Sequence, residues 1–137
     1  MRLARTLLVA SALAATTACG GSTTTDPIVG TFLATTFRIA PAGQGAIDVL
    51  AQGGVLGLNV ANNFVTAGTL IIPASVNGGT TFTASLAGTA VRTESTVRFT
   101  QSADTFVRDL TFTLAADSLT ANQTLGDTTY DLVLRRQ

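Results

Sequence analysis

Apolar and polar residues alternate with a period of two along most of the chain after Pro27. The clearest run is FVRDLTFTL at 106–114, where Arg108 is the one charged residue among the apolar positions. Such alternation predicts β-strands with one buried face. Similar runs predict strands at 29–39, 47–51, 55–60, 64–72, 80–87, 90–100 (with a break near Glu94), 106–114, 118–123 and 129–136.

Short segments rich in glycine, asparagine and aspartate separate these runs, for example PAGQG at 41–45 and VNGG at 76–79. These residues tolerate the positive φ angles that tight hairpins need. The connections leave no room for crossover helices, so the sheet is expected to be antiparallel. We therefore predict an all-β, up-and-down meander of about eight to ten strands that closes into a barrel. A two-sheet β-sandwich is the alternative.

The first eighteen residues have a different pattern. Arg2 and Arg5 precede the apolar run LLVASALAA at 7–15, and small residues follow it. This order is typical of a secretory signal peptide, which is helical before it is removed. The run is shorter than the roughly 20 apolar residues of a membrane-spanning helix. We therefore predict a signal peptide at 1–18 and an exported protein.

The only cysteine of the chain, Cys19, follows this segment directly. The sequence TTAC at 16–19 resembles the lipobox of bacterial lipoproteins, in which the cysteine carries the lipid and becomes the mature N-terminus. The resemblance implies lipidation of Cys19 and anchoring in the bacterial cell envelope. Gly20 stands where an aspartate would retain such a protein at the inner membrane, which favours the outer membrane. The alternative is a conventional signal peptide followed by an incidental cysteine.

Residues GGSTTTDP at 20–27 are small and polar and show no periodicity, which is typical of a flexible tether. A chain spans at most about 3.3–3.6 Å per residue, so the folded domain is expected close to the membrane surface. The predicted organisation is a signal peptide at 1–18, a lipidated cysteine and tether at 19–27, and a barrel domain at 28–137.

The composition narrows the possible functions. Eight basic and eight acidic residues balance, and no basic cluster is available for nucleic acid or anionic lipid. Histidine and lysine are absent, which removes Ser-His-Asp catalysis, the commonest zinc ligand and Schiff-base chemistry. Most carboxylates fall in turns or on polar faces. We therefore predict no catalytic residue, no metal site and no cofactor.

The two ends of the predicted barrel resemble the lipocalin-like (calycin) family. The segment DPIVGTF at 26–32 is similar to the family's G-x-W opening, with Gly30 in place and Phe32 at the tryptophan position. The segment YDLVLRR at 130–136 is similar to the last strand, whose arginine packs across that ring; Arg135 or Arg136 would match it. The resemblance implies a barrel that is closed at one end by these residues.

Three residues are candidates for ligand binding. Arg108 would either reach the barrel rim or anchor a ligand carboxylate inside the barrel. Gly68 and Ala84 lie among larger apolar residues and would leave space for a ligand in a partly filled interior. Two functions remain open: a non-catalytic binding module for a small apolar ligand, or a surface protein that contacts a partner and whose barrel is filled.

Overall fold

The computed structural model describes residues 24–137, so the predicted signal peptide and Cys19 lie outside the described residues. These residues form an all-β fold with a single helical turn, α1 (Phe106–Asp109). The strands are β1 (Gly30–Pro41), β2 (Ile47–Asp48), β3 (Val55–Val60), β4 (Val65–Ile72), β5 (Phe82–Ser85), β6 (Gly88–Thr93), β7 (Thr96–Gln101), β8 (Thr111–Ala115), β9 (Ser118–Leu125) and β10 (Thr128–Arg136).

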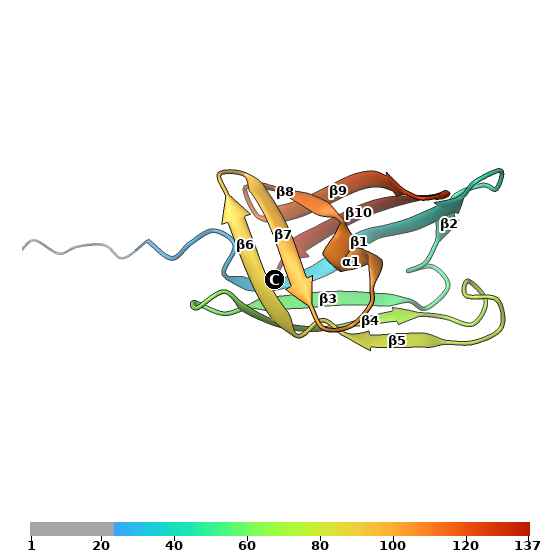
Figure 1. The fold of residues 1–137 in the computed structure, drawn as a ribbon, viewed down its shortest axis with the longest axis horizontal. Coiled ribbons are helices and arrows are strands. Elements are labelled where there is room, and N and C mark those ends of the chain that lie inside the picture. The colour runs from blue at the N-terminus through green and yellow to red at the C-terminus, as the bar shows by residue number, and fades with distance from the viewer. Residues whose placement is uncertain (1–23) are drawn as a thin grey trace, which may run out of the picture.

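Eight strands close an antiparallel ring in the order β1, β3, β4, β6, β7, β8, β9 and β10, and β10 pairs back with β1. The two remaining strands are additions, because β2 pairs with β1 and β5 pairs with β4. The ring follows chain order, as Figure 1 shows. The predicted up-and-down barrel is therefore confirmed. The sandwich alternative is excluded, because a sandwich consists of two separate sheets with free edge strands, whereas these eight strands form one closed ring.

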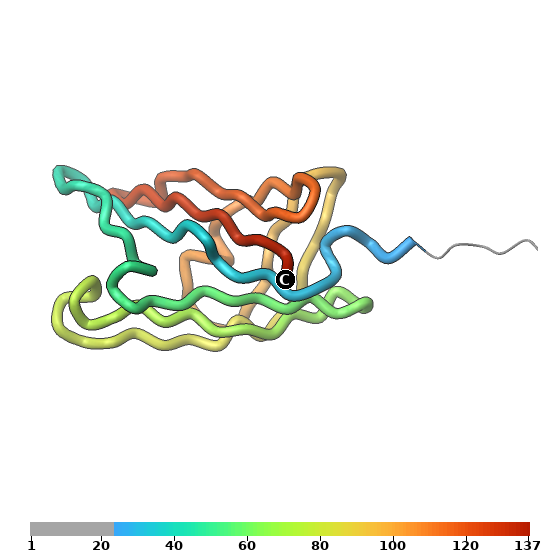
Figure 2. Tube along the Cα trace, turned by 180° about the vertical axis from the view of Figure 1, so that it is seen from behind, coloured from blue at the N-terminus to red at the C-terminus, as the bar shows by residue number. Residues whose placement is uncertain are grey.

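The pairing of β1 with β10 joins the two ends of the chain. It runs from Phe32 opposite Arg136 to Pro41 opposite Thr128, with an irregularity between Ala34 and Thr36. A bulge of this kind bends a strand and increases its local twist, which helps a sheet to close. Figure 2 shows the first and last strands side by side. Closure is thus made by residues that are far apart in the sequence.

β4 exchanges one partner for another at Gly68. Val65 and Thr66 pair with β6, whereas Thr69 to Ile72 pair with β5. Gly68 has a φ of 157°, and a Cβ on it would collide with the carbonyl oxygen of Gly57 on β3. Glycine permits this close backbone approach. The close approach of β3 therefore requires glycine at this position, and the expected role of Gly68 in leaving space for a ligand stays a prediction.

Apolar side chains from every strand of the ring fill the barrel. On β3, for example, Leu56, Leu58 and Val60 are buried, whereas Val55, the first residue of the strand, is exposed. The largest fully buried side chains are Ile28, Phe32, Phe37, Leu56, Leu58, Leu70, Leu86, Leu110, Phe112, Leu119, Leu132 and Leu134. This period-two burial explains why alternation located most strands correctly.

The predicted strand at 106–114 is wrong in its first half. Phe106–Asp109 form the helical turn α1, in which the Leu110 amide donates to the Phe106 carbonyl, and β8 begins only at Thr111. Val107, which strand alternation placed outside, is buried. Phe106 and Leu110 are four residues apart, so their spacing also fits one turn of a helix. The break expected near Glu94 is present, and Glu94 has a φ of 55° in the turn between β6 and β7.

Candidate functional site

One end of the barrel is closed by Arg136. Its guanidinium carbon lies 4.9 Å from the centroid of the Phe32 ring, and Phe32 is fully buried. The guanidinium donates hydrogen bonds to the carbonyl oxygens of Pro27 and Val29. Its Nε lies 3.3 Å from the carboxylate of Asp117. Of the two candidate arginines, Arg136 is the one that packs across the aromatic ring; the side chain of Arg135 is exposed.

Gly30 leaves room for this guanidinium. A Cβ at Gly30 would lie 2.5 Å from Nη1 of Arg136, and the φ of Gly30 is 141°. Both the space and the backbone angle therefore require glycine. Gly30, Phe32 and Arg136 act together as the closure of this end, and a larger residue at Gly30 would displace the arginine.

The chain enters the barrel at the same end. Asp26 accepts a hydrogen bond of 3.0 Å from the amide of Ile28 and an ion-pair contact of 2.9 Å from Arg92 on β6. Ile28 is fully buried. Asp26 and Pro27, which the sequence assigned to the tether, are thus bound to the barrel wall and to Arg136. Any flexible tether ends before Asp26.

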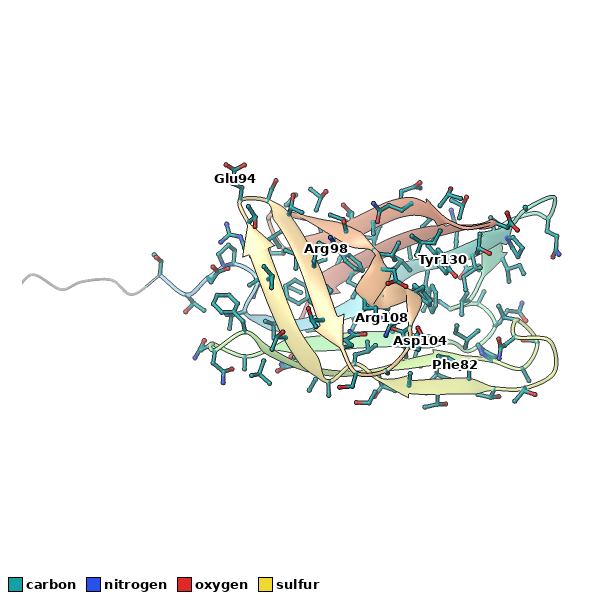
Figure 3. The ribbon with its side chains drawn as sticks, viewed as in Figure 1. Phe82, Glu94, Arg98, Asp104, Arg108 and Tyr130 are labelled. Atoms are coloured by element: carbon teal, nitrogen blue, oxygen red, sulfur yellow. The ribbon has the colours of Figure 1, made fainter. Side chains whose placement is uncertain are left out.

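An aromatic cluster lies further along the barrel, formed by Phe37 on β1, Phe106 on α1 and Tyr130 on β10. The Phe106 and Tyr130 rings stack with centroids 4.4 Å apart, and Phe37 lies 5.8 Å from Phe106. Phe37 is fully buried, whereas Phe106 and Tyr130 are half-buried. Figure 3 shows Tyr130 in the layer of β10 and half-buried Phe82 in the opposite layer. Among residues 24–137, no arginine covers these rings as Arg136 covers Phe32.

The surroundings of Tyr130 affect its ionisation. Burial raises the pKa of its phenol, and the nearby negative charge of Asp109 raises this pKa further. The phenol therefore stays neutral at physiological pH. Because the chain has one tyrosine and no tryptophan, the emission of Tyr130 reports on this cluster alone.

The barrel wall is interrupted beside α1. The β7–β8 pairing joins only Thr96–Arg98 with Thr111–Thr113, because α1 takes the place of further strand. A depression of about 520 Å³ lies at this interruption and is lined by Val91, Arg98, Phe99, Thr100, Gln101, Arg108 and Asp109. No strand pairs with the end of β7 on this side.

Arg108 lies at the rim of this depression, on α1 and outside the barrel. Its guanidinium is 2.6 Å from a carboxylate oxygen of Asp104 and 3.7 Å from one of Asp109. Figure 3 shows Arg108 and Asp104 near the start of α1. The negative charges of these two acids offset much of the positive charge with which Arg108 would bind a ligand carboxylate. The sequence analysis expected Arg108 at the barrel rim or inside the barrel, whereas both of its ion-pair partners here are exposed side chains.

A buried polar pair, Gln101 and Thr105, lies at the end of β7 just before α1. The exposed fractions are 6 % for Gln101 and 4 % for Thr105. The Thr105 hydroxyl donates to the Gln101 side-chain oxygen at 3.0 Å, and the Gln101 amide nitrogen has no partner within residues 24–137. No pattern in the sequence indicates this pair, because QSAD at 101–104 is composed of residues typical of a polar turn.

Ala84 lies on β5 opposite Leu70 and is half-buried against the core. The depressions described on residues 24–137 open to the outer surface, and buried apolar side chains lie inside the barrel. The ligand-binding roles expected for Gly68 and Ala84 stay predictions. The part of the chain described contains no group of three acidic, histidine or cysteine side chains placed to hold a metal ion.

The chain matches no known family model, no curated protein and no solved structure in the comparisons made. The closed antiparallel ring of eight strands is nevertheless consistent with a lipocalin-like fold. Among residues 24–137, no helix is long and apolar enough to span a membrane.

Proposed function

We propose that this protein is a lipid-anchored protein of the bacterial cell envelope whose barrel binds a small apolar ligand and catalyses no reaction. The aromatic cluster is the observation that supports this proposal most directly. Phe106 and Tyr130 stack but remain partly exposed, whereas Phe32 at the other end is covered by Arg136. A partly exposed aromatic pair is a surface that a ligand can cover.

The packed interior restricts the ligand to a small molecule that lies against the cluster. Covering apolar surface contributes about 25 cal/mol per Å² removed from water. Aromatic contacts add about 0.5–1.5 kcal/mol beyond this area effect. The neutral phenol of Tyr130 offers one polar group beside the rings, so a ligand with an apolar body and one polar atom fits best. Binding deep in the barrel would require displacement of fully buried side chains.

The ligand-binding part of the proposal is tested by titration of the barrel with an environment-sensitive fatty-acid probe. The chain used begins at Gly20, so that it contains every residue of the closed barrel and no lipid. We expect saturable binding in the micromolar range, accompanied by a change in Tyr130 emission. Phe106→Ala is expected to weaken binding by about tenfold or more, equivalent to about 1.4 kcal/mol or more.

Phe64→Ala is the matched control for this titration. Phe64 is also a half-buried phenylalanine, but it lies in the turn before β4 and lines a depression that includes Asp26 at the closed end. Its truncation is expected to leave the affinity for the probe unchanged. Absence of saturable binding to the folded wild-type barrel would contradict the ligand-binding proposal, and so would equal losses in the two variants.

The lipid anchor is tested separately in cells. Metabolic labelling with palmitate should mark the wild-type protein, and Cys19→Ser should abolish the label and leave the precursor uncleaved by the lipoprotein signal peptidase. If the wild-type protein carries no label, the anchoring part of the proposal is wrong even where the barrel binds its ligand.

A further inference from the structure

One third of the chain carries no charge. No aspartate, glutamate, lysine, arginine or histidine occurs between Asp48 and Arg92. This stretch contains β3, β4, β5 and most of β6, and the first three of these strands are hydrogen-bonded neighbours. They form the lower layer in Figure 1. The charged residues that follow Val91 lie on the rest of the ring, so the barrel has one charge-free side.

The outer face of this side exposes apolar side chains. We call it the charge-free wall and define it by Leu33 on β1, Val55 on β3, and Val65, Ala67, Thr69 and Ile71 on β4. The exposed fractions are 43 % for Leu33, 42 % for Val55 and 47 % for Val65, and these are three of the four large hydrophobic side chains exposed on residues 24–137. Val55 lies directly opposite Ile71 in the β3–β4 register.

Small residues limit how far side chains project from the charge-free wall. Gly57 on β3 lies between Leu33 and Thr69 in the strand register. A Cβ at Gly57 would lie 2.9 Å from Cδ2 of Leu33, so the leucine side chain extends over the glycine. Ala67 and Thr69 have short side chains. A sheet face with short side chains permits another sheet to pack at a spacing of about 10 Å.

We propose that the charge-free wall is a dimer interface and that its occupant is a second copy of this chain. Charge complementarity supports this choice. A partner that presented arginines or carboxylates would have to desolvate them without any opposite charge on the wall. A second copy brings no charge to the contact. Its threonine hydroxyls can both donate and accept hydrogen bonds, so the wall is complementary to itself.

A twofold axis is the simplest arrangement, because it places the same patch of both copies in one contact. Interface centres are generally depleted in charged residues, as the charge-free wall is. The opposite wall differs, since Asp117 on the β8–β9 turn, Asp131 on β10 and Arg135 on β10 face away from the core. That wall remains solvated, so the proposed dimer does not extend into a larger assembly.

Sedimentation velocity of the chain that begins at Gly20, measured over a series of concentrations, tests the proposal without any ligand. We expect a monomer–dimer equilibrium. Val65→Glu and Val55→Lys each place a charge on the wall and should raise the dimer dissociation constant by about tenfold or more. Two variants on different strands are used in case one does not fold, and circular dichroism verifies the fold of each.

Two controls separate charge from a general effect of substitution. Val65→Thr removes apolar surface without adding charge and should keep the dimer within about threefold of the wild-type affinity, since the wall already contains threonine. Thr113→Glu adds a charge to the exposed face of β8 and should leave the dimer unchanged. A wild-type chain that stays monomeric at every concentration overturns the proposal, and so does equal weakening by Val65→Glu and Thr113→Glu.

A lipid surface is the other occupant that the experiment distinguishes. If the wild-type chain is monomeric but sediments with phosphatidylethanolamine–phosphatidylglycerol vesicles, and Val65→Glu prevents this, the wall binds lipid and the dimer is ruled out. Neither result depends on whether the aromatic cluster binds a ligand.

Discussion

At the scale of single residues, Arg136 makes several contacts that no other side chain of the described barrel combines. It covers the Phe32 ring, donates to two carbonyl oxygens near the chain entry and lies beside the Asp117 carboxylate. The planar guanidinium allows these contacts at once because its donors point in fixed, different directions. A lysine at this position would lose the forked geometry as well as most of the stacking.

Arg136→Met is expected to lower the free energy of unfolding by about 2–4 kcal/mol, because it removes a cation–π contact and hydrogen bonds from a charged donor. Arg136→Lys should recover only part of this loss. Arg135→Met is the control, because Arg135 is the preceding residue and its side chain is exposed. This substitution should lower the free energy of unfolding by less than about 0.5 kcal/mol. Urea unfolding followed by circular dichroism measures all three; similar costs at both positions would contradict the assigned role of Arg136.

Tyr130 gives a prediction on pH dependence. Burial raises its pKa, so the folded state holds the phenolic proton more tightly than the unfolded state does. The associated stability is fully present below the unfolded pKa of about 10 and is lost as the pH rises through the folded pKa. In the chain that begins at Gly20, lysine, cysteine and other tyrosines are absent, so no other side chain titrates in this range.

The free energy of unfolding should therefore decrease above about pH 10 in the wild type, and this decrease should be absent in Tyr130→Phe. Circular dichroism follows the unfolding, because it does not require the tyrosine. An ultraviolet titration of the folded wild type gives the folded pKa independently. Equal alkaline destabilisation of both proteins would mean that Tyr130 is not the group responsible.

At the scale of elements, β8 shows how a strand and a helical turn share one sequence pattern. Phe112 and Leu114 face the core, and the Phe112 ring meets Phe99 of β7 edge-on at 5.3 Å. Thr111 lies on the opposite face. Its backbone amide, and not its side chain, donates a hydrogen bond to the side-chain oxygen of Gln123. Before Thr111 the chain has no strand partner on β7, and it adopts α1.

Phe112→Ala should cost about 3–5 kcal/mol of unfolding free energy, because it leaves a cavity next to Phe99 in a packed core. Thr111→Ala should cost less than about 1 kcal/mol, since the hydrogen bond of its amide is retained. Chemical unfolding of both variants under the same conditions tests the difference. Comparable losses would show that both faces of β8 are covered, contrary to the barrel.

At the scale of the whole molecule, closure depends on pairing between β1 and β10 rather than on chain connectivity. Thr31 of the first strand and Gln137 just after the last strand meet at the closed end, where the Gln137 amide donates to the Thr31 carbonyl at 3.0 Å. The turn after β4 lies far from this point in the ribbon of Figure 1, and its residues Asn77 to Gly79 are largely exposed. Such a turn tolerates a chain break, because few contacts depend on its continuity.

A circular permutant that joins Gln137 to Asp26 through a short flexible linker and begins at Gly79 should therefore fold. We expect a wild-type-like circular dichroism spectrum and a single cooperative unfolding transition, with a stability loss of only about 1–3 kcal/mol. Loss of the cooperative transition would show that connectivity between β4 and β5 is needed for closure. A permutant cut within β9, which severs a strand of the ring, is the negative control.

Much of the fold follows from local patterns. Alternation located the strands because each has one face in the core and one in water, and β3 was predicted with its observed bounds. Gly30, Phe32 and an arginine at 135 or 136 were expected to close one end only because the first and last strands resemble those of the lipocalin-like family. The absence of charge between Asp48 and Arg92 is also visible in the sequence.

Other features arise only from packing in three dimensions. Period-two spacing alone predicts that Phe106–Asp109 is a strand. Whether this segment forms a strand or a helical turn depends on whether β7 offers it a pairing partner, and β7 does not. The close approach of β3 to Gly68, which only glycine permits, has no signal in the local pattern. Gln101 stands in a segment typical of a polar turn, yet the fold buries it together with Thr105. Local sequence thus specifies which residues avoid water, whereas ring closure decides which distant residues meet, which of two arginines covers Phe32, and which strands form one uncharged wall.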